Sequence, residues 1–152
     1  NGACGVSVLC RAEIGQLLVR SAGGTLVPLE QVSSGWAIGK LAHPLLPEPH
    51  TAEDLARLAE KGDATAMQLL IEAWKPLAEA ICHVIALLCP ERIILGGGVS
   101  LMGDTLLFQP LRSLVEERVF APFRGLFEIV PATLGEEVVL HGAIALAASR
   151  SA

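Results

Sequence analysis

The chain has 152 residues, of which 52% are hydrophobic, 18% charged and 4% aromatic, and its formal net charge is −5. Disordered chains carry fewer aliphatic residues and more charge, so this composition predicts a folded chain, and we expect a single domain over residues 1–152. Scattered Lys and Arg disfavour a nucleic-acid groove, which needs clustered positive charge. The longest apolar run, residues 80–89, is shorter than the about 20 residues that span a membrane.

The cysteines and histidines give no metal-binding pattern. Cys4, Cys10, Cys82 and Cys89 contain no CxxC pair, and the four histidines are widely spaced. Free cysteine is among the most buried residue types, so we expect reduced core residues. Reduced cysteines favour a cytosolic compartment, and no signal peptide is visible.

The first third of the chain is predicted to hold short extended pieces ahead of its first helix. The pieces are a strand over 3–9, a turn over 21–24, an extended segment over 25–28, a helix from Leu29 or Ser34 to about His43, and a proline-rich loop to Pro49.

Two well-capped helices follow. Thr51 is a good N-cap, and Asp54 can answer it as in a capping box, so a helix should run from Ala52 to Gly62. Asp63 should cap a long amphipathic helix that ends at Cys89 and Pro90. Pro76 lies inside that helix and should kink or split it, because proline removes a backbone donor.

The second half of the chain alternates strands and helices. A buried strand over 92–95, helices over 106–119 and 140–149, a strand over 126–131 and a loop over 135–137 are expected. Such alternation predicts an α/β fold in which helices pack on a central sheet.

The strongest local signal is the run Ile93 to Ser100, in which Gly96, Gly97 and Gly98 follow the predicted strand. Glycines let a ligand or another backbone approach closely, and ligands of open α/β sheets bind at the carboxyl ends of strands. A nucleotide contact is one interpretation, and a tight strand-to-helix corner without a ligand is the other. The run is not a Walker loop, because no Lys-Ser or Lys-Thr follows.

Three polar side chains interrupt the amino-terminal region. Glu13, Gln16 and Glu30 could accept hydrogen bonds from sugar hydroxyls if a turn at Gly15 lets the first two converge. The alternative is a solvated strand end followed by a helix-start glutamate. Similarly, the Ser-Ser-Gly run 33–35 could present backbone N–H groups to an anion or serve only as a helix cap.

Several short pieces together resemble the ROK family of bacterial sugar kinases and sugar-responsive repressors. They are Ala-Glu-Ile-Gly-Gln at 12–16, Leu-Glu-Gln-Val-Ser-Ser-Gly at 29–35, Gly-Asp-Ala-Thr-Ala at 62–66, Pro-Glu-Arg-Ile-Ile-Leu-Gly-Gly-Gly-Val-Ser at 90–100 and Gly-Ala-Ile-Ala-Leu-Ala at 142–147. The resemblance covers most of this chain but only the C-terminal half of the family's pattern. It implies one lobe of an actin-like, hexokinase-like ATPase fold, which is ribonuclease H-like.

The resemblance also implies roles for individual residues. Glu13 and Glu30 would bind sugar hydroxyls, and Gln16 stands where the family usually has a histidine that touches the sugar and ligates zinc. Gly96, Gly97 and Gly98 would line the adenosine site, and the resemblance implies ATP with Mg²⁺ as the cofactor. Zinc is not supported, because residues 17–29 contain neither Cys nor His.

The family's catalytic aspartate and its Asp-x-Gly-x-Thr phosphate motif belong to an N-terminal lobe and are not found in this sequence. The chain alone should therefore not catalyse. Three hypotheses remain open: the lobe of an ATP-dependent sugar kinase that pairs with an N-terminal lobe, the sensor half of a repressor whose DNA-binding helices lie upstream, and a degenerate or structural member that dimerises and binds nothing. A homo-oligomer is expected in each case, since family members commonly assemble and a lone lobe exposes an apolar wall.

Overall fold

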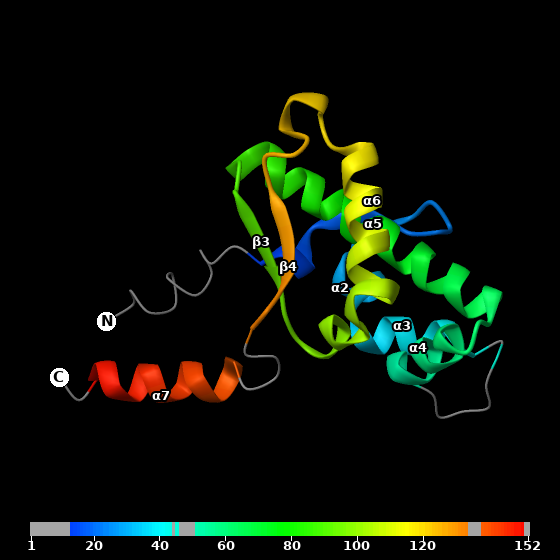
Figure 1. Ribbon diagram of the computed structural model, residues 1–152, viewed down its shortest axis with the longest axis horizontal. Coiled ribbons are helices and arrows are strands. Elements are labelled where there is room, and N and C mark those ends of the chain that lie inside the picture. The colour runs from blue at the N-terminus through cyan, green and yellow to red at the C-terminus, as the bar shows by residue number, and fades with distance from the viewer. Residues whose placement is uncertain (1–12, 44, 46–50, 134–137, 151–152) are drawn as a thin grey trace.

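The computed structural model describes residues 13–43, 45, 51–133 and 138–150. The strand expected over 3–9, the loop over 135–137 and the two amino-terminal cysteines lie outside the described residues. Figure 1 shows a body of helices and strands from which the last helix lies apart.

A small hairpin opens the described chain. A 3₁₀ turn, η1 (Ile14–Gln16), leads into β1 (Leu18–Arg20), which pairs antiparallel with β2 (Leu26–Pro28). The expected turn between them is confirmed, since the Gly24 amide donates to the Ser21 carbonyl at 2.9 Å. The hairpin delivers the chain to the first helices.

The helix expected from either Leu29 or Ser34 is in fact two helices. These are α2 (Glu30–Ser33) and α3 (Gly35–Leu41), separated by Ser34 with an extended ψ of 162°. The Ser34 side chain accepts from the Ala37 amide at 3.4 Å, so this serine is a helix cap.

The two capped helices form as their end signals predict. In α4 (Ala52–Glu60), Thr51 and Asp54 form the reciprocal capping box, and Asp63 caps α5 (Ala64–Leu88) by accepting from the Ala66 amide. Of the kink or split expected at Pro76, the split is wrong, because α5 is one 25-residue helix through that position. Pro76 is buried within this helix.

The central sheet is a parallel pair, β3 (Arg92–Leu95) and β4 (Glu128–Pro131). Between the two strands lie η2 (Gly98–Met102), the π-helical turn η3 (Asp104–Phe108), α6 (Gln109–Arg118) and η4 (Ala121–Phe123). The expected α/β architecture with helices packed on a sheet is confirmed, and α7 (Val138–Arg150) ends the described chain.

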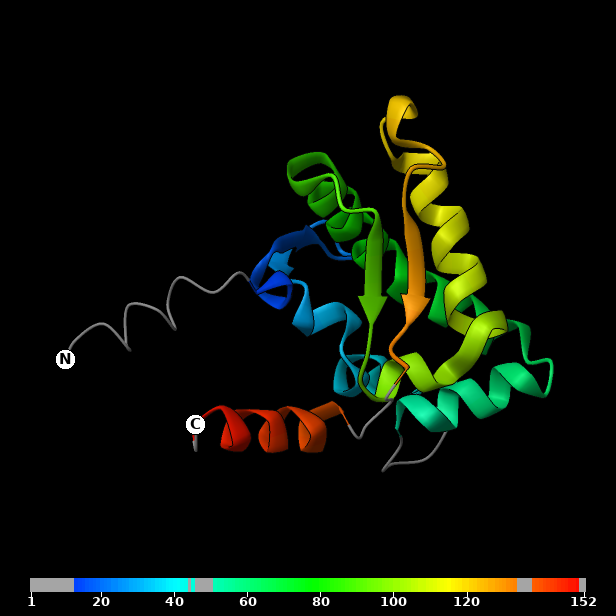
Figure 2. The same ribbon diagram turned by 60° about the vertical axis from the view of Figure 1, so that its left-hand side comes forward.

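The main core lies between the strand pair, α5 and α6. It includes the fully buried Trp74, Ile81, Phe108 and Leu111, and Ile129 of β4 packs into it. Figures 1 and 2 show α3 and α4 lying beyond the carboxyl ends of both strands. This arrangement leaves the strand ends facing a second group of helices.

Two burial expectations are wrong. The strand 92–95 is not buried, because Ile94 points away from the core and is 62% exposed, whereas its neighbours pack inward. Cys89 is exposed rather than in the core, and it ends α5 in the left-handed conformation with φ 46°. Cys82 is half-buried and free, and burial raises the pKa of its thiol.

Among the described residues, none of the helices combines the length and the apolar character needed to cross a bilayer. The exposed side chains of α7 include Leu140, Ile144 and Leu146.

Candidate functional site

The triple glycine turns the chain sharply after β3. Gly96 passes so close to β4 that a Cβ there would lie 3.3 Å from the Ala132 Cβ. Gly97 has φ 83° and ψ 176°, a conformation that is essentially restricted to glycine. The backbone conformation therefore requires glycine at position 97, whereas a Cβ at position 96 would need Ala132 to shift by a few tenths of an ångström.

Ser100 fixes the turn that follows. Both its amide and its hydroxyl donate to the Gly97 carbonyl, at 3.0 and 2.7 Å. The side chain is buried, so the two bonds satisfy a polar group that would otherwise be costly to bury. The result is a short 3₁₀ helix that presents Gly98 and Val99 toward α3.

A cavity of about 1050 Å³ lies at the carboxyl end of β3, between η2, α3 and α4. This volume is about that of clefts for small molecules, roughly 300–1,000 Å³. Its lining combines small and apolar residues with a charged rim: Gly35, Trp36, Gly39, Lys40, Thr51, Ala52, Glu53, Ala56, Arg57, Glu60, Gly98, Val99, Leu101 and Met102.

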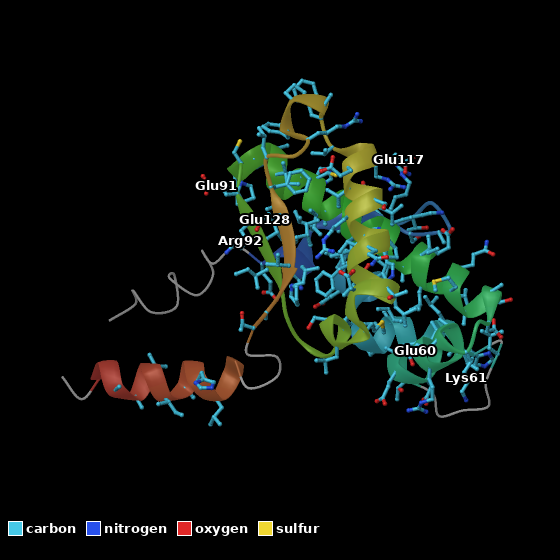
Figure 3. All side chains as sticks on the ribbon, in the orientation of Figure 1. Glu60, Lys61, Glu91, Arg92, Glu117 and Glu128 are labelled. Carbon is cyan, nitrogen blue, oxygen red and sulfur yellow. The ribbon has the colours of Figure 1, made fainter. Side chains whose placement is uncertain are left out.

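The charged rim is partly neutralised by its own ion pairs. Arg57 pairs with Glu53 at 3.0 Å and with Asp54 at 3.1 Å along α4. Glu60 stands one helical turn further on α4, where Figure 3 labels it. Lys40 instead places its ammonium 4.4 Å from the centre of the Trp36 ring.

The polar residues predicted for sugar binding form a separate group. The turn expected at Gly15 exists as η1, with Glu13 as its N-cap. The Leu29 amide donates to the Leu17 carbonyl at 2.8 Å, which brings Glu30 beside this turn. Glu13, Gln16 and Glu30 are all exposed, so their oxygens are open to a ligand.

The group formed by Glu13, Gln16 and Glu30 is close to the cavity residues of α3 along the chain, but it does not line the cavity. Of the three predicted nucleotide-site glycines, only Gly98 lines the cavity, while Gly96 and Gly97 shape the turn leading to it. Glu13, Gln16 and Glu30 lie outside its lining. Glu30 begins α2, whose last residue, Ser33, is anchored to α5 by a 2.8 Å bond to the Ala73 carbonyl, and α3 follows directly.

Sequence reasoning missed the cavity residues of α3 and α4. Trp36 beside a glycine, with Lys40 one turn later, was a usable signal, because residues four apart share a helix face. The contribution of Arg57 and Ala56 had no such signal, since it depends on how α4 packs against η2.

A second hollow of about 610 Å³ lies at the opposite end of the strands. Its lining includes Arg92 and Glu128, which already form an ion pair at 2.9 Å, and Figure 3 shows them far from Glu60. Within the described ranges, no group of three or more His, Cys, Asp or Glu side chains is placed to hold a metal ion.

Known proteins resemble this chain in sequence. A glucokinase of Thermotoga maritima is 32% identical over 91% of this chain and 50% of its own length. A bifunctional enzyme NanE/NanK of Brucella melitensis is 33% identical over 98% of this chain and 27% of its own length. The chain thus spans about half or less of these relatives.

Solved structures share the fold. A ROK family glucokinase from Streptomyces griseus, solved with glucose and AMPPNP, matches 83% of this chain and 47% of its own with a TM-score of 0.70 at 21% identity. A ROK family transcriptional regulator, a homolog of the E. coli MLC protein, matches 79% and 34% with a TM-score of 0.64 at 24% identity. These likenesses confirm the expected actin-like, hexokinase-like ATPase fold.

The ROK family model matches residues 20–150, which is most of the sequence. The resemblance drawn from short motifs is thereby confirmed, and the chain belongs to the ROK family.

Proposed function

We propose that this chain is the C-terminal sugar- and nucleotide-binding lobe of a ROK-type sugar kinase. The kinase would transfer the γ-phosphoryl group of ATP to a hydroxyl of a hexose or amino-hexose. The observation that carries the proposal is the cavity at the carboxyl end of β3, bordered by Gly98 and joined through α2 and α3 to the exposed group Glu13, Gln16 and Glu30. Ligands of open α/β sheets bind at this end of the strands.

The two parts of the site have different chemistry. The carboxylates of Glu13 and Glu30 can accept hydrogen bonds from sugar hydroxyls, and the Gln16 amide can both donate and accept. The cavity suits the base and ribose of a nucleotide, because its walls at Gly98, Val99 and Ala56 are small or apolar.

The rest of the reaction lies outside this lobe in the proposal. The base that takes the proton of the attacking hydroxyl is an aspartate of an N-terminal lobe. This chain's residues bind and orient the two substrates, which is most of what phosphoryl transfer requires of a protein.

Calorimetric titration of the full chain with glucose and glucosamine, with and without ATP, tests the sugar site. We expect a binding heat that Glu30→Ala removes without lowering the thermal midpoint, since Glu30 is exposed. Glu91→Ala is the matched control, an exposed glutamate at the opposite end of the strands (Figure 3). Equal sugar binding by both variants would refute the assignment of Glu30.

A sensor domain without catalysis is the second candidate, favoured by the structural likeness to a ROK transcriptional regulator. A coupled assay of ADP formation on the protein with both lobes separates the two. Sugar-dependent ADP formation supports the kinase, whereas sugar binding with no ADP formed supports the sensor.

A further inference from the structure

Trp36 is the large aromatic side chain that borders the cavity. It is 55% exposed, although an indole of this size gains much from burial. The only other tryptophan, Trp74, is fully buried and donates from Nε1 to the Leu106 carbonyl at 2.8 Å. The two therefore have different tasks: Trp74 holds the core, and Trp36 presents a ring to the cavity.

The start of α3 places Trp36 next to the glycine turn. Trp36 follows Gly35, and a Cβ on Gly35 would lie 3.7 Å from the Val99 Cγ2, so α3 begins close to η2. Gly98 and Leu101 line the same cavity from η2. A flat ligand entering there meets the glycine backbone on one side and the indole on another.

In this structure the Trp36 indole contacts a cationic side chain. Lys40 lies one helical turn after Trp36, and its Nζ is 4.4 Å from the ring centre. Lys40 forms no ion pair with a carboxylate of the described residues, whereas Arg57 on the opposite wall has two. A cation–π contact at an exposed site is weak, so a stacking ligand can replace it.

We propose that Trp36 is the stacking platform for the purine base of the nucleotide, and that Lys40 leaves the ring on binding to pair with the nucleotide's phosphates. This inference rests on the proposed nucleotide site and deepens it by naming a specificity-determining residue. An exchange of Lys40 for a purine base on the ring explains why Trp36 stays exposed beside an ammonium group that has no carboxylate partner among the described residues.

Tryptophan fluorescence of the full chain, titrated with adenosine, ADP and ribose 5-phosphate, tests the platform. Adenosine and ADP should quench the emission, and ribose 5-phosphate, which has no base, should not. In Trp36→Phe, only Trp74 remains, and the quenching should disappear. Because Trp74 is buried in the core, its emission maximum also reports that each variant is folded.

Affinities measured by calorimetry give the second readout. Trp36→Ala should weaken adenosine about 5- to 150-fold, the range expected for losing one base–aromatic stack. Leu26→Ala is the matched control, because Leu26 is 57% exposed on the hairpin and lies outside the cavity lining. This control should leave the adenosine affinity unchanged.

The Lys40→Gln variant tests whether Lys40 moves from the Trp36 ring to the nucleotide's phosphates or only packs on the ring. Adenosine carries no charge, so removal of the competing ammonium should leave its affinity unchanged or raise it by about 2- to 5-fold. The phosphates of ADP should lose the Lys40 ammonium as their partner, so the ratio of ADP to adenosine affinity should fall by about 5-fold or more.

Each contrary outcome has its own meaning. Unchanged adenosine affinity in Trp36→Ala would overturn the stacking role of Trp36 but not the proposed nucleotide site. Equal weakening of adenosine and ADP in Lys40→Gln overturns the exchange. If the unmodified chain binds neither ligand at millimolar concentration, the platform falls together with the nucleotide half of the proposed function.

Discussion

Gly15 lies directly against Glu30: a Cβ built on Gly15 would be 3.7 Å from the Glu30 Cβ and 3.8 Å from its Oε2. Both distances are ordinary van der Waals contact. A methyl group therefore fits at this position, but any branch beyond it meets the carboxylate that we assign to sugar hydroxyls.

This contact predicts a graded response to the size of residue 15. Gly15→Ala should bind glucose like the unmodified chain, and Gly15→Val should push Glu30 aside and weaken glucose about 10- to 150-fold, as for the loss of a hydrogen bond to a charged group. Calorimetry with glucose measures both, and thermal midpoints confirm folding. If valine and alanine give the same affinity, the Glu30 carboxylate does not contact the sugar.

Helix ends could be predicted from the sequence because their signals are local. The capping box of Thr51 and Asp54 and the Asp63 cap involve residues three positions apart, and all form as expected. The positive φ of Gly62 ends α4 in the same way. The parallel pair β3–β4 also fits the expected alternation of elements.

Packing at long range could not be predicted. The cavity lies where Gly35 of α3 comes close to Val99 of η2, and no pattern in the sequence reports that approach. The exposure of Ile94 was missed for a related reason: an apolar run does not reveal whether one face of its strand or both are covered. The helix also continues through the buried Pro76, so tertiary context outweighs the local signal for a split.

Gly97 should be sensitive to any side chain, although a Cβ there would meet nothing within 4 Å. Its φ of 83° and ψ of 176° are the cause, and Gly97→Ala should cost about 1–3 kcal/mol of the free energy of unfolding. Because Gly97 also accepts both hydrogen bonds from Ser100, the substitution should disturb η2 and weaken adenosine.

Gly24 offers a matched control for this strain. It has φ 80° in the hairpin turn, again with nothing within 4 Å of an added Cβ. Gly24→Ala should lower the free energy of unfolding and leave adenosine affinity unchanged. Denaturant unfolding and calorimetry on the two variants provide the comparison, and an adenosine defect in Gly24→Ala but not in Gly97→Ala would contradict the role of the glycine turn.

Trp74 should be a main support of the core. Trp74→Phe leaves the buried Leu106 carbonyl without its donor, which costs about 1–3 kcal/mol, and it also leaves a void. Denaturant unfolding should show a lower midpoint with the m-value unchanged. Trp36→Phe, at an exposed position, should stay within about 0.5 kcal/mol of the unmodified chain. Equal stability of the two variants would mean that the Trp74 bond contributes nothing.

Asp104 should make stability depend on pH through its two partners. Gln109 donates to its Oδ2 at 2.6 Å, and Arg112 pairs with Oδ1 at 2.7 Å. The hydrogen bond from Gln109, followed by that from Arg112, holds the pKa of the Asp104 carboxyl below its ordinary value. Arg112 also donates to the Ile129 carbonyl, so this cluster ties the start of η3 to β4.

The direction in which stability changes with pH follows from the lowered pKa of Asp104. Folding favours the charged carboxylate, so its stabilising effect is complete at neutral pH and is lost as the pH falls through the lowered pKa. Asp104→Asn should therefore melt at a lower temperature than the unmodified chain at pH 7, and the difference should shrink below about pH 4. Thermal melts across this range measure it, with Glu117→Gln as the control for losing one exposed carboxylate. A midpoint difference that stays constant from pH 7 to pH 2 would show that Asp104 acts through its shape and not through its charge.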